Sequence, residues 1–582
     1  MKSDLPDTSR RRRHEHPCRL SRSRFSIAAS ALLSLCLTHA GCFSGDPPSL
    51  YYGKISVPRS QQFRWSDGGL PQTFDPAFAA APPDTDVVRA LFEGLTDYDP
   101  QTLAPVPAVA TRWESSGDGR IWTFYLREDA RWSNGETVTA NDFVRSWERT
   151  LKIGPLAPHT ELLANIEGAI STQPSTKALK DLKVKPEESP RPQLFGAKAL
   201  SDHVLQVRLL HADSSFPALV AHPVFRPVKI ALADVTKRIE PRDLVSNGAF
   251  QLSGTDSAGV MLERAKNYWD GDSVGLQRVE FVSMTNAEDA LTAYRAGEID
   301  AVTNAAFEPL ALKLLAPYKD FRRSTFGAIT YYGFNLARAP FDDVRVREAL
   351  AISIDRERVS RDDLGGATVP AGKFLPDALS AEKPVVGKTD LLEQDLNRAR
   401  ELLSEAGHAN GEGFPVVRLL INRNEQQRIV AQSIATMWRT VLNIQTEIVM
   451  KSWDEYEAAI KAGDYDVVRR GMVMQTPGEL TNLRMLFERD FQAAPLLKPE
   501  ADAPRSRDNE SAAGGLLQGS GGDPGWADSE TQALKELKVM PIYFASSFAL
   551  VKPYVSGFDA NVLDAPSLKK TRIDSNWVER KP

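Results

Sequence analysis

Alternating apolar and polar positions define a strand over residues 122–127, where Trp, Phe and Leu alternate with Thr, Tyr and Arg. A period of two is typical of a strand with one packed face and one partly solvated face. Asn134-Gly135 then predicts a hairpin turn, because both residue types tolerate positive φ. Thr139 stands three residues before Asp142, which is capping-box spacing and predicts the start of a helix. Together these elements predict a hairpin packed on a helix.

Tryptophans in this stretch invite a functional interpretation, since four fall at positions 113, 122, 132 and 147. Large aromatic side chains more often pack in a core than line a ligand-binding site. The residues alone therefore favour a structural role.

Two further stretches follow a strand–helix–strand order. The helix-period segments end at glycine or before a short apolar strand, which is typical of α/β units around a mixed sheet. A separate alternating stretch, Leu200–Leu209, predicts one more strand. In the first strand–helix–strand stretch, strands are expected at 279–281 and 299–302 and a helix at 287–296. In the second, strands are expected at 416–422 and 444–450 and a helix at 429–442.

The N-terminus has the order of a secretory signal. Arginines 10–13 precede an apolar run from Phe25 to Leu37, and small residues follow before Cys42. The run is too short for a bilayer core, which takes about 20 residues. Residues 1–41 are therefore interpreted as a signal peptide, and the Ser-, Pro- and Gly-rich stretch 42–60 as a tether.

Composition describes an ordinary globular protein with room for two to four domains in 582 residues. The formal charge is −5, and removal of residues 1–41, with eight Lys and Arg against three Asp and Glu, leaves about −10. An acidic chain is a poor nucleic-acid binder, because phosphate neutralisation supplies most of that affinity. No catalytic or metal-binding motif is present, so neither an enzyme nor a cofactor is expected.

Several motifs resemble those of the oligopeptide-binding proteins of ABC importers, bacterial extracellular solute-binding protein family 5. They are the EGL of 93–95, W-E-x-S-x-D-G-x-x-W-T-F-x-L-R at 113–127, W-S-N-G-x-x-V-T-A-x-D-F-V-x-S-W-x-R at 132–149, and the P-F-D-D-V-R-V-R-E-A-L of 340–350. The resemblance implies an α/β, two-lobe periplasmic-binding-protein-like fold of type II with an extra small α+β domain. Lobe I would comprise 61–95, 226–324 and 541–582, the small extra domain 96–225, and lobe II 325–540. Residues 500–528 have no period and are expected to form a disordered insert.

In such proteins a short peptide lies between the lobes and pairs its backbone with strand edges. The resemblance implies that a carboxylate in a W-x-x-D segment holds the peptide's amino group. Here the tryptophan is replaced by Met472 and the aspartate by Gln475. A neutral amide supplies no counter-charge, so the usual anchor is missing unless Glu479 reaches in.

Other ligand-contact positions match the family better. Tyr331, Tyr332 and Asn335 would face the cleft, and Trp453 and Arg469 match an aromatic and a basic position of the second lobe. The structural alternatives are core packing for the tyrosines and a surface salt bridge for the arginine.

The segment Leu37–Cys42 resembles the lipobox of bacterial lipoproteins, with His39 in place of an aliphatic residue. The resemblance implies acylation of Cys42 and a monomer anchored by lipid in the periplasm or cell envelope, working with an ABC permease and ATPase. An ordinary signal peptide is the alternative for the segment. For the whole chain, the alternative function is a non-transport envelope lipoprotein, a sensor or scaffold, that retains the fold with a degenerate peptide site.

Overall fold

A computed structural model describes residues 50–169, 195–229, 239–284, 286–380, 392–491 and 529–579. Met1–Leu50 and Tyr51–Pro582 form separate units, and every described helix and strand belongs to the second. The predicted signal peptide, Cys42 and the insert 500–528 lie outside the described residues. The expected tether 42–60 needs correction where it is described, because the Tyr52 backbone N–H donates to Asp320 Oδ1 at 2.9 Å. This part of the stretch is bound to the fold.

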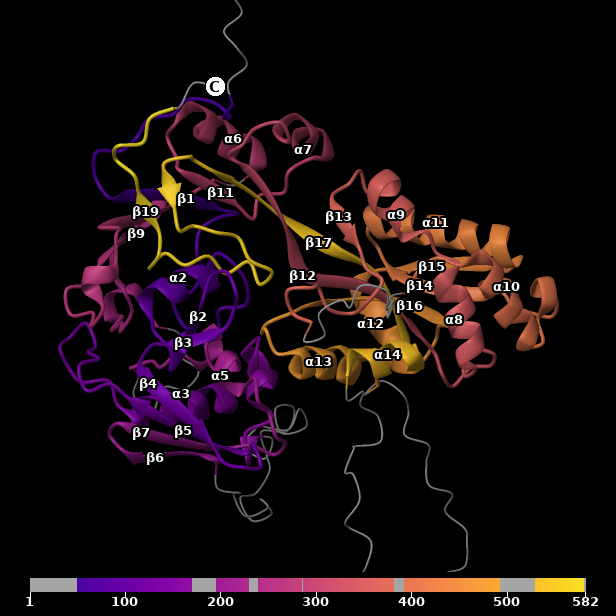
Figure 1. Ribbon diagram of the computed structural model, residues 1–582, viewed down its shortest axis with the longest axis horizontal. Coiled ribbons are helices and arrows are strands. Elements are labelled where there is room, and N and C mark those ends of the chain that lie inside the picture. The colour runs from indigo at the N-terminus through magenta and orange to yellow at the C-terminus, as the bar shows by residue number, and fades with distance from the viewer. Residues whose placement is uncertain are drawn as a thin grey trace, which may run out of the picture. The chain divides into compact units, whose positions relative to one another are not determined.

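One mixed sheet of eleven strands organises the described part of the chain (Figure 1). Its first-lobe part has β1 (Gln62–Asp67) parallel to both β10 (Arg278–Val282) and β11 (Ala301–Thr303), with β9 (Gly259–Arg264) and β8 (Phe250–Thr255) added antiparallel. Its second-lobe part has β14 (Val417–Asn422) parallel to β15 (Thr446–Lys451) and to β16 (Val467–Val473). The α/β expectation is therefore confirmed in both parts.

Two long antiparallel strands, β12 (Phe321–Phe334) and β17 (Val539–Val551), run through both parts of the sheet. β17 pairs with β11 at one end, and β12 pairs with β16 at the other, while short β13 (Thr368–Pro370) pairs with β17. The pairing register of β12 and β17 shifts between Thr325 and Ile329. The expected boundaries at 325 and 541 fall inside these strands, so both strands belong to the packing of both lobes.

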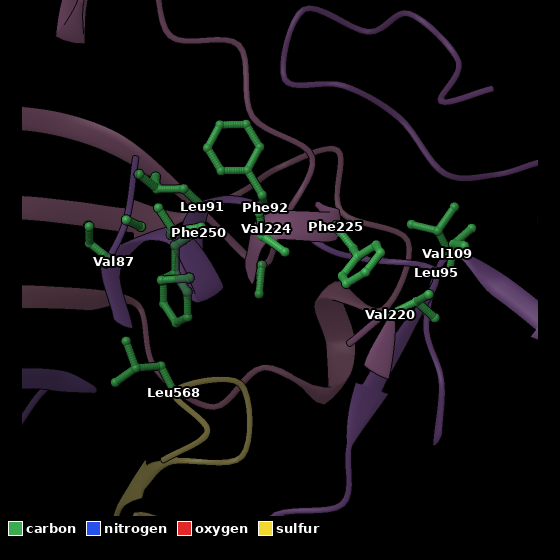
Figure 2. Packing of buried hydrophobic residues seen from close by; sticks show 14 of the residues in the cluster. Val87, Leu91, Phe92, Leu95, Val109, Val220, Val224, Phe225, Phe250 and Leu568 are labelled. Atoms are coloured by element: carbon green, nitrogen blue, oxygen red, sulfur yellow. The ribbon is translucent and has the colours of Figure 1, made fainter. Parts of the chain in front are cut away.

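Helices α2 (Asp84–Leu91), α6 (Ala287–Ala296) and α7 (Pro309–Leu315) belong to the first lobe. Gly297 adopts φ 78° directly after α6, in the left-handed region where glycine is favoured at a helix end. Figure 2 shows Val87, Leu91 and Leu568 gathered around the ring of Phe250 in the core of this lobe. The C-terminal segment also forms β18 (Val555–Ser556) and β19 (Arg572–Ile573).

A small α+β part follows α2 in the chain. Two strands, β2 (Thr96–Tyr98) and β3 (Pro105–Pro107), precede a four-stranded antiparallel sheet of β4 (Ala110–Ser115), β5 (Ile121–Leu126), β7 (Val204–Arg208) and β6 (Ala197–Ser201). The predicted capping box at Thr139 and Asp142 is present and opens α3 (Ala140–Ile153); α5 (Phe216–Leu219) comes later. The single strand expected over 200–209 is wrong, since a turn at Asp202-His203 divides it between β6 and β7.

Three helices of the second lobe, α8 (Val344–Ile352), α10 (Leu396–Glu405) and α11 (Glu425–Leu442), pack around a separate apolar core that includes Trp438, Leu419 and Tyr332. Trp438 Nε1 donates to the carbonyl of Leu350 at 3.0 Å, which joins α11 to α8. Helix α12 (Trp453–Ala462) packs in another cluster, and α13 (Glu479–Phe491) and α14 (Glu530–Glu536) contribute to the cluster that contains Tyr331. The short α9 (Arg356–Arg358) also belongs to this lobe.

Candidate functional site

Strand β16 carries the segment where the ligand anchor was expected. It runs antiparallel to β12, with Arg469 opposite Tyr332 and Met472 opposite Ile329. Because side chains alternate along a strand, Met472 is buried at 3% exposure whereas Val473 is 43% exposed. The methionine that replaces the expected tryptophan therefore packs in the core, and Gly471 and Val473 lie on the open face.

Gln475, just beyond β16, contacts a histidine 253 residues earlier in the chain. Its Oε1 lies 3.3 Å from His222 Nε2, and its Nε2 donates to the carbonyl of Val473 at 3.3 Å. The Val224 N–H donates to His222 Nδ1 at 3.2 Å, so that nitrogen carries no proton and Nε2 is the donor to Gln475. Both ends of the Gln475 amide are thus bonded within the protein.

The environment keeps His222 neutral. Burial holds its pKa well below the usual value, and the neighbouring His159 and Arg89 act in the same direction. The two imidazole rings lie edge to face with centroids 5.0 Å apart, and His159 Nε2 donates to the carbonyl of Ala80 at 2.8 Å. The His222–Gln475 pair therefore offers no negative charge to an ammonium group. Sequence reasoning missed His222, because no spacing connects it with Gln475.

Glu479 is the first residue of α13, and its Oε1 accepts the backbone N–H of Glu530 at 3.4 Å. Glu530 is itself the first residue of α14, so this carboxylate lies near a helix N-terminus, where negative charge is favoured. The contact links two helices of the second lobe.

Arg469 is arranged differently from its neighbour Arg470. Its Nη2 donates to Thr330 Oγ1 at 3.3 Å, while its buried Nε has no hydrogen-bond partner among the residues that the structure describes. Among the described residues no ion pair is found for Arg469, whose neighbour Arg470 holds the nearby Glu457, so the surface salt bridge of the structural alternative is not found there. Arg470, by contrast, pairs with Glu457 at 3.5 Å.

Trp453 is linked to Arg469 through Tyr456, which contacts both residues. It is 61% exposed at the start of α12, with its ring 5.6 Å from that of Tyr456. The Tyr456 hydroxyl donates to the backbone carbonyl of Arg469. The structure therefore brings the predicted aromatic and basic positions into one region.

Tyr331 and Tyr332 are fully buried, so neither reaches solvent from β12. Tyr331 packs with Ile329, Met472 and Met474, whereas Tyr332 packs in the second-lobe core, where burial raises its pKa. These placements favour the structural alternative for both side chains.

Asn335 also has a structural role in this arrangement. Its Nδ2 donates to the carbonyls of Gly463, at 3.1 Å, and Tyr465, at 2.9 Å. These bonds hold the turn that connects α12 to β16.

A cavity of about 690 Å³ lies beside the stretch where the β12–β17 register shifts. This volume is within the usual range for small-ligand pockets. Lys373 and Asp377, paired at 2.7 Å, supply its charge. None of the predicted site residues lines it. The lining is Gln101–Leu103, Ser324, Thr325, Val369, Pro370, Gly372, Lys373, Pro376–Ala378, Phe544 and Ala560–Val562.

Within the described ranges, none of the helices combines the length and the apolar character that crossing a membrane requires. In those same parts of the chain, no three His, Cys, Asp or Glu side chains are grouped to hold a metal ion.

The chain was compared with known families, proteins and structures. Residues 104–492 match the model of the bacterial extracellular solute-binding proteins, family 5 middle region. The periplasmic oligopeptide-binding protein OppA of Salmonella typhimurium is 28% identical over 546 residues, covering 92% of this chain and 95% of OppA. The periplasmic murein peptide-binding protein MppA of Escherichia coli is 30% identical over 503 residues, covering 85% and 90%.

Among solved structures, the unliganded open form of the periplasmic murein tripeptide-binding protein MppA superposes with a TM-score of 0.70 at 27% identity, covering 89% of this chain and 98% of that one. The expected fold class, a two-lobe type II periplasmic-binding-protein fold, is thereby confirmed. The family and these relatives are binding proteins. The family model spans more than half of the sequence, and the chain therefore belongs to the bacterial extracellular solute-binding proteins of family 5.

Proposed function

We propose that this chain is the extracytoplasmic solute-binding component of a peptide ABC importer and captures short peptides between its lobes. The observation that carries the proposal is the edge of β16. β14 pairs with β16 only at Val467 and Val468, so among described strands the edge from Arg469 to Val473 has no partner on that side. An extended peptide adds to such an edge through backbone hydrogen bonds. The peptide-binding names of the two relatives support the same ligand class.

The ligand anchor at Gln475 is altered in this proposal. A peptide bound at about 1 µM has roughly −8 kcal/mol in total. Removing one member of a buried charge pair costs about 2 to 5 kcal/mol. Without a carboxylate at 475, affinity rests on the backbone of β16 and on Arg469, with Trp453 beside it. Tyr331, Tyr332, Asn335 and Glu479 remain ligand-contact predictions, with both tyrosines buried and Asn335 bonded to the turn before β16 in this structure.

Calorimetry tests this function directly. The mature protein is titrated with a diverse library of two- to six-residue peptides, and saturable heat is expected for several of them. Absence of heat and of any thermal shift across the whole library would overturn the proposal.

We further propose that Cys42 is acylated and anchors the mature chain, a monomer, in the periplasm or cell envelope, where it delivers ligand to an ABC permease and its ATPase. Cys18 and Cys36 lie in the removed segment, so Cys42 is the single thiol of the mature chain. Mass spectrometry of the N-terminal peptide is expected to find a lipid-modified cysteine. An unmodified residue there, or unchanged membrane fractionation of Cys42→Ser, would contradict the anchor.

One observation favours a second function, an envelope lipoprotein that senses or scaffolds without transport. The Gln475 amide is bonded to His222 and to Val473, which leaves it without the role of the expected carboxylate. Gln475→Asp separates the two functions. If peptides bind only to Gln475→Asp, the native site has lost transport ligands; if the wild type binds and the variant changes little, peptide capture stands.

A further inference from the structure

Helix α7 presents two large apolar side chains to solvent. Leu310 and Leu314 are 68% and 65% exposed and stand four residues apart, so they share one face of the helix. The next residue, Leu315, lies about 100° further round the helix and is buried in a core cluster with Tyr294 and Val302. Contiguous exposed apolar side chains mark an interaction surface more often than isolated ones do.

The exposed neighbours of the two leucines are two cations, small apolar residues and one carboxylate, that of Glu308 at the N-cap of α7. Pro309, Lys313, Ala316 and Lys319 are all exposed. We call these four residues, with Leu310 and Leu314, the α7 surface. Leucines with flanking lysines are the combination expected of an element that rests at a lipid headgroup boundary, with the leucines in the apolar layer and the lysines near phosphates.

The chain enters the fold against the inner side of the same helix. The Tyr52 ring lies 5.3 Å from that of Tyr318, three residues beyond α7, and packs against the cluster that contains Leu315. Lys552 Nζ donates to the carbonyl of Lys54 at 3.0 Å and so holds the incoming segment. In Figure 1, α7 lies beside α6, whose Arg295 carbonyl accepts the Lys54 N–H at 2.8 Å.

The sequence limits the distance from this entry point to the proposed lipid. Leu50 follows Cys42 by eight positions. Eight residues span at most about 28 Å even when fully extended. Acylation of Cys42 would therefore limit how far Leu50 can lie from the lipid and would raise the effective concentration of lipid at the fold.

We propose that the α7 surface is a membrane-contact surface, which lies on anionic lipid when the protein is anchored. The inference rests on the lipid anchor of the proposed function. Contact there would orient the first lobe towards the bilayer.

The test uses the full lipoprotein in vesicles of phosphatidylcholine and phosphatidylglycerol that contain a headgroup spin-labelled lipid. A fluorophore is attached at Leu310→Cys, or, as the matched control, at Leu156→Cys, whose leucine is 66% exposed. Acylation leaves Cys42 without a free thiol, so only the new cysteine is labelled. We expect at least threefold stronger quenching at 310 than at 156. Equal quenching at the two positions, or none at 310, overturns the proposal.

A second tether keeps the test independent of acylation. A hexahistidine tag in place of residue 42 holds the mature chain on a nickel-chelating lipid, and the same difference between 310 and 156 is expected. If the natural protein does not float with the vesicles, the proposed lipid anchor at Cys42 is contradicted, and the chelator-tethered protein still tests the α7 surface. Protection of 310 only after addition of permease would assign the α7 surface to a protein partner and overturn the membrane contact.

Discussion

His222 Nε2 donates a hydrogen bond to Gln475 Oε1 across 3.3 Å, joining the segment before η4 (Pro223–Phe225) to the end of β16. Both groups are neutral, and the histidine is buried. The bond connects the small α+β part with the second lobe at the position where a ligand ammonium was expected to find a carboxylate. The two uncharged side chains satisfy each other there.

His222 is expected to make the fold acid-sensitive. Its pKa is lowered in the folded state by burial, so the unfolded chain, with an ordinary histidine pKa of about 6.5, binds the proton more readily. The stabilising contribution is full above about pH 6.5 and is lost as pH falls towards the folded pKa. His222→Gln keeps an N–H donor without titrating. The melting temperature of the wild type should fall more steeply between pH 6.5 and 5 than that of His222→Gln.

An exposed histidine provides the control for that slope. His211→Gln should retain the steep wild-type profile, because the His211 side chain is exposed. Parallel pH profiles for the wild type and His222→Gln would refute the assignment.

The buried carboxyl group of Asp564 is expected to change stability with pH in the opposite direction to His222. Burial raises its pKa to about 6, although the Ser547 hydroxyl donates to its Oδ1 at 3.0 Å. A raised folded pKa gives stability that is full below the unfolded value of about 3.9 and is lost as pH rises through about 6. Asp564→Asn keeps the acceptor and removes the charge. Relative to the wild type it should gain about 1.4 kcal/mol in the free energy of unfolding between pH 5 and pH 8.

Urea denaturation at the two pH values measures this gain. The exposed Asp272 is the matched control, and Asp272→Asn is expected to show no pH-dependent difference from the wild type. A constant offset for Asp564→Asn at both pH values would contradict the prediction.

Local elements of the fold were predictable because their signals lie within a few residues. The capping box of α3 and the glycine stop of α6 are such signals, and both are confirmed. The pairing of β12 with β17 joins residues about 200 positions apart, and no local pattern fixes its register. Tyr331 and Tyr332 point to opposite faces of β12, and both faces are packed. The sequence pattern of such a strand does not show which side chains face a ligand cleft and which face a core.

The candidate site depended still more on distant contacts. Replacement of the expected aspartate by Gln475 was visible in the sequence, but its partner His222 lies 253 residues away. Arg469 and Arg470 are adjacent and chemically identical in sequence. Their tertiary contacts distinguish them, since Arg470 pairs with Glu457 whereas Arg469 donates to Thr330.

A buried ion pair fixes α3 to the segment after β1. Arg149 Nη1 and Nη2 donate to the Asp75 carboxylate at 2.9 and 2.6 Å, with both side chains almost completely buried. Arg149→Met leaves an unpaired buried carboxylate and should cost about 3–5 kcal/mol in the free energy of unfolding. Arg149→Met/Asp75→Asn removes that charge and should recover part of the loss in urea denaturation. A double variant no more stable than Arg149→Met would show that packing, rather than the stranded charge, sets the cost.

Arg469 provides the sharpest test of ligand capture. Among the described residues its guanidinium has no carboxylate partner, its buried Nε has no hydrogen-bond partner, and its Nη2 donates only to the neutral Thr330 hydroxyl, so its charge remains for a ligand carboxylate. Arg469→Met should weaken binding of peptides with a free C-terminal carboxylate at least tenfold and leave C-terminally amidated peptides nearly unchanged. Arg470→Met is the control, since Arg470 is paired with Glu457 and its loss should affect both peptide classes equally. Calorimetry with each pair of peptides measures the difference, and an equal loss for both classes in Arg469→Met would assign Arg469 to the scaffold of β16 instead of to the ligand.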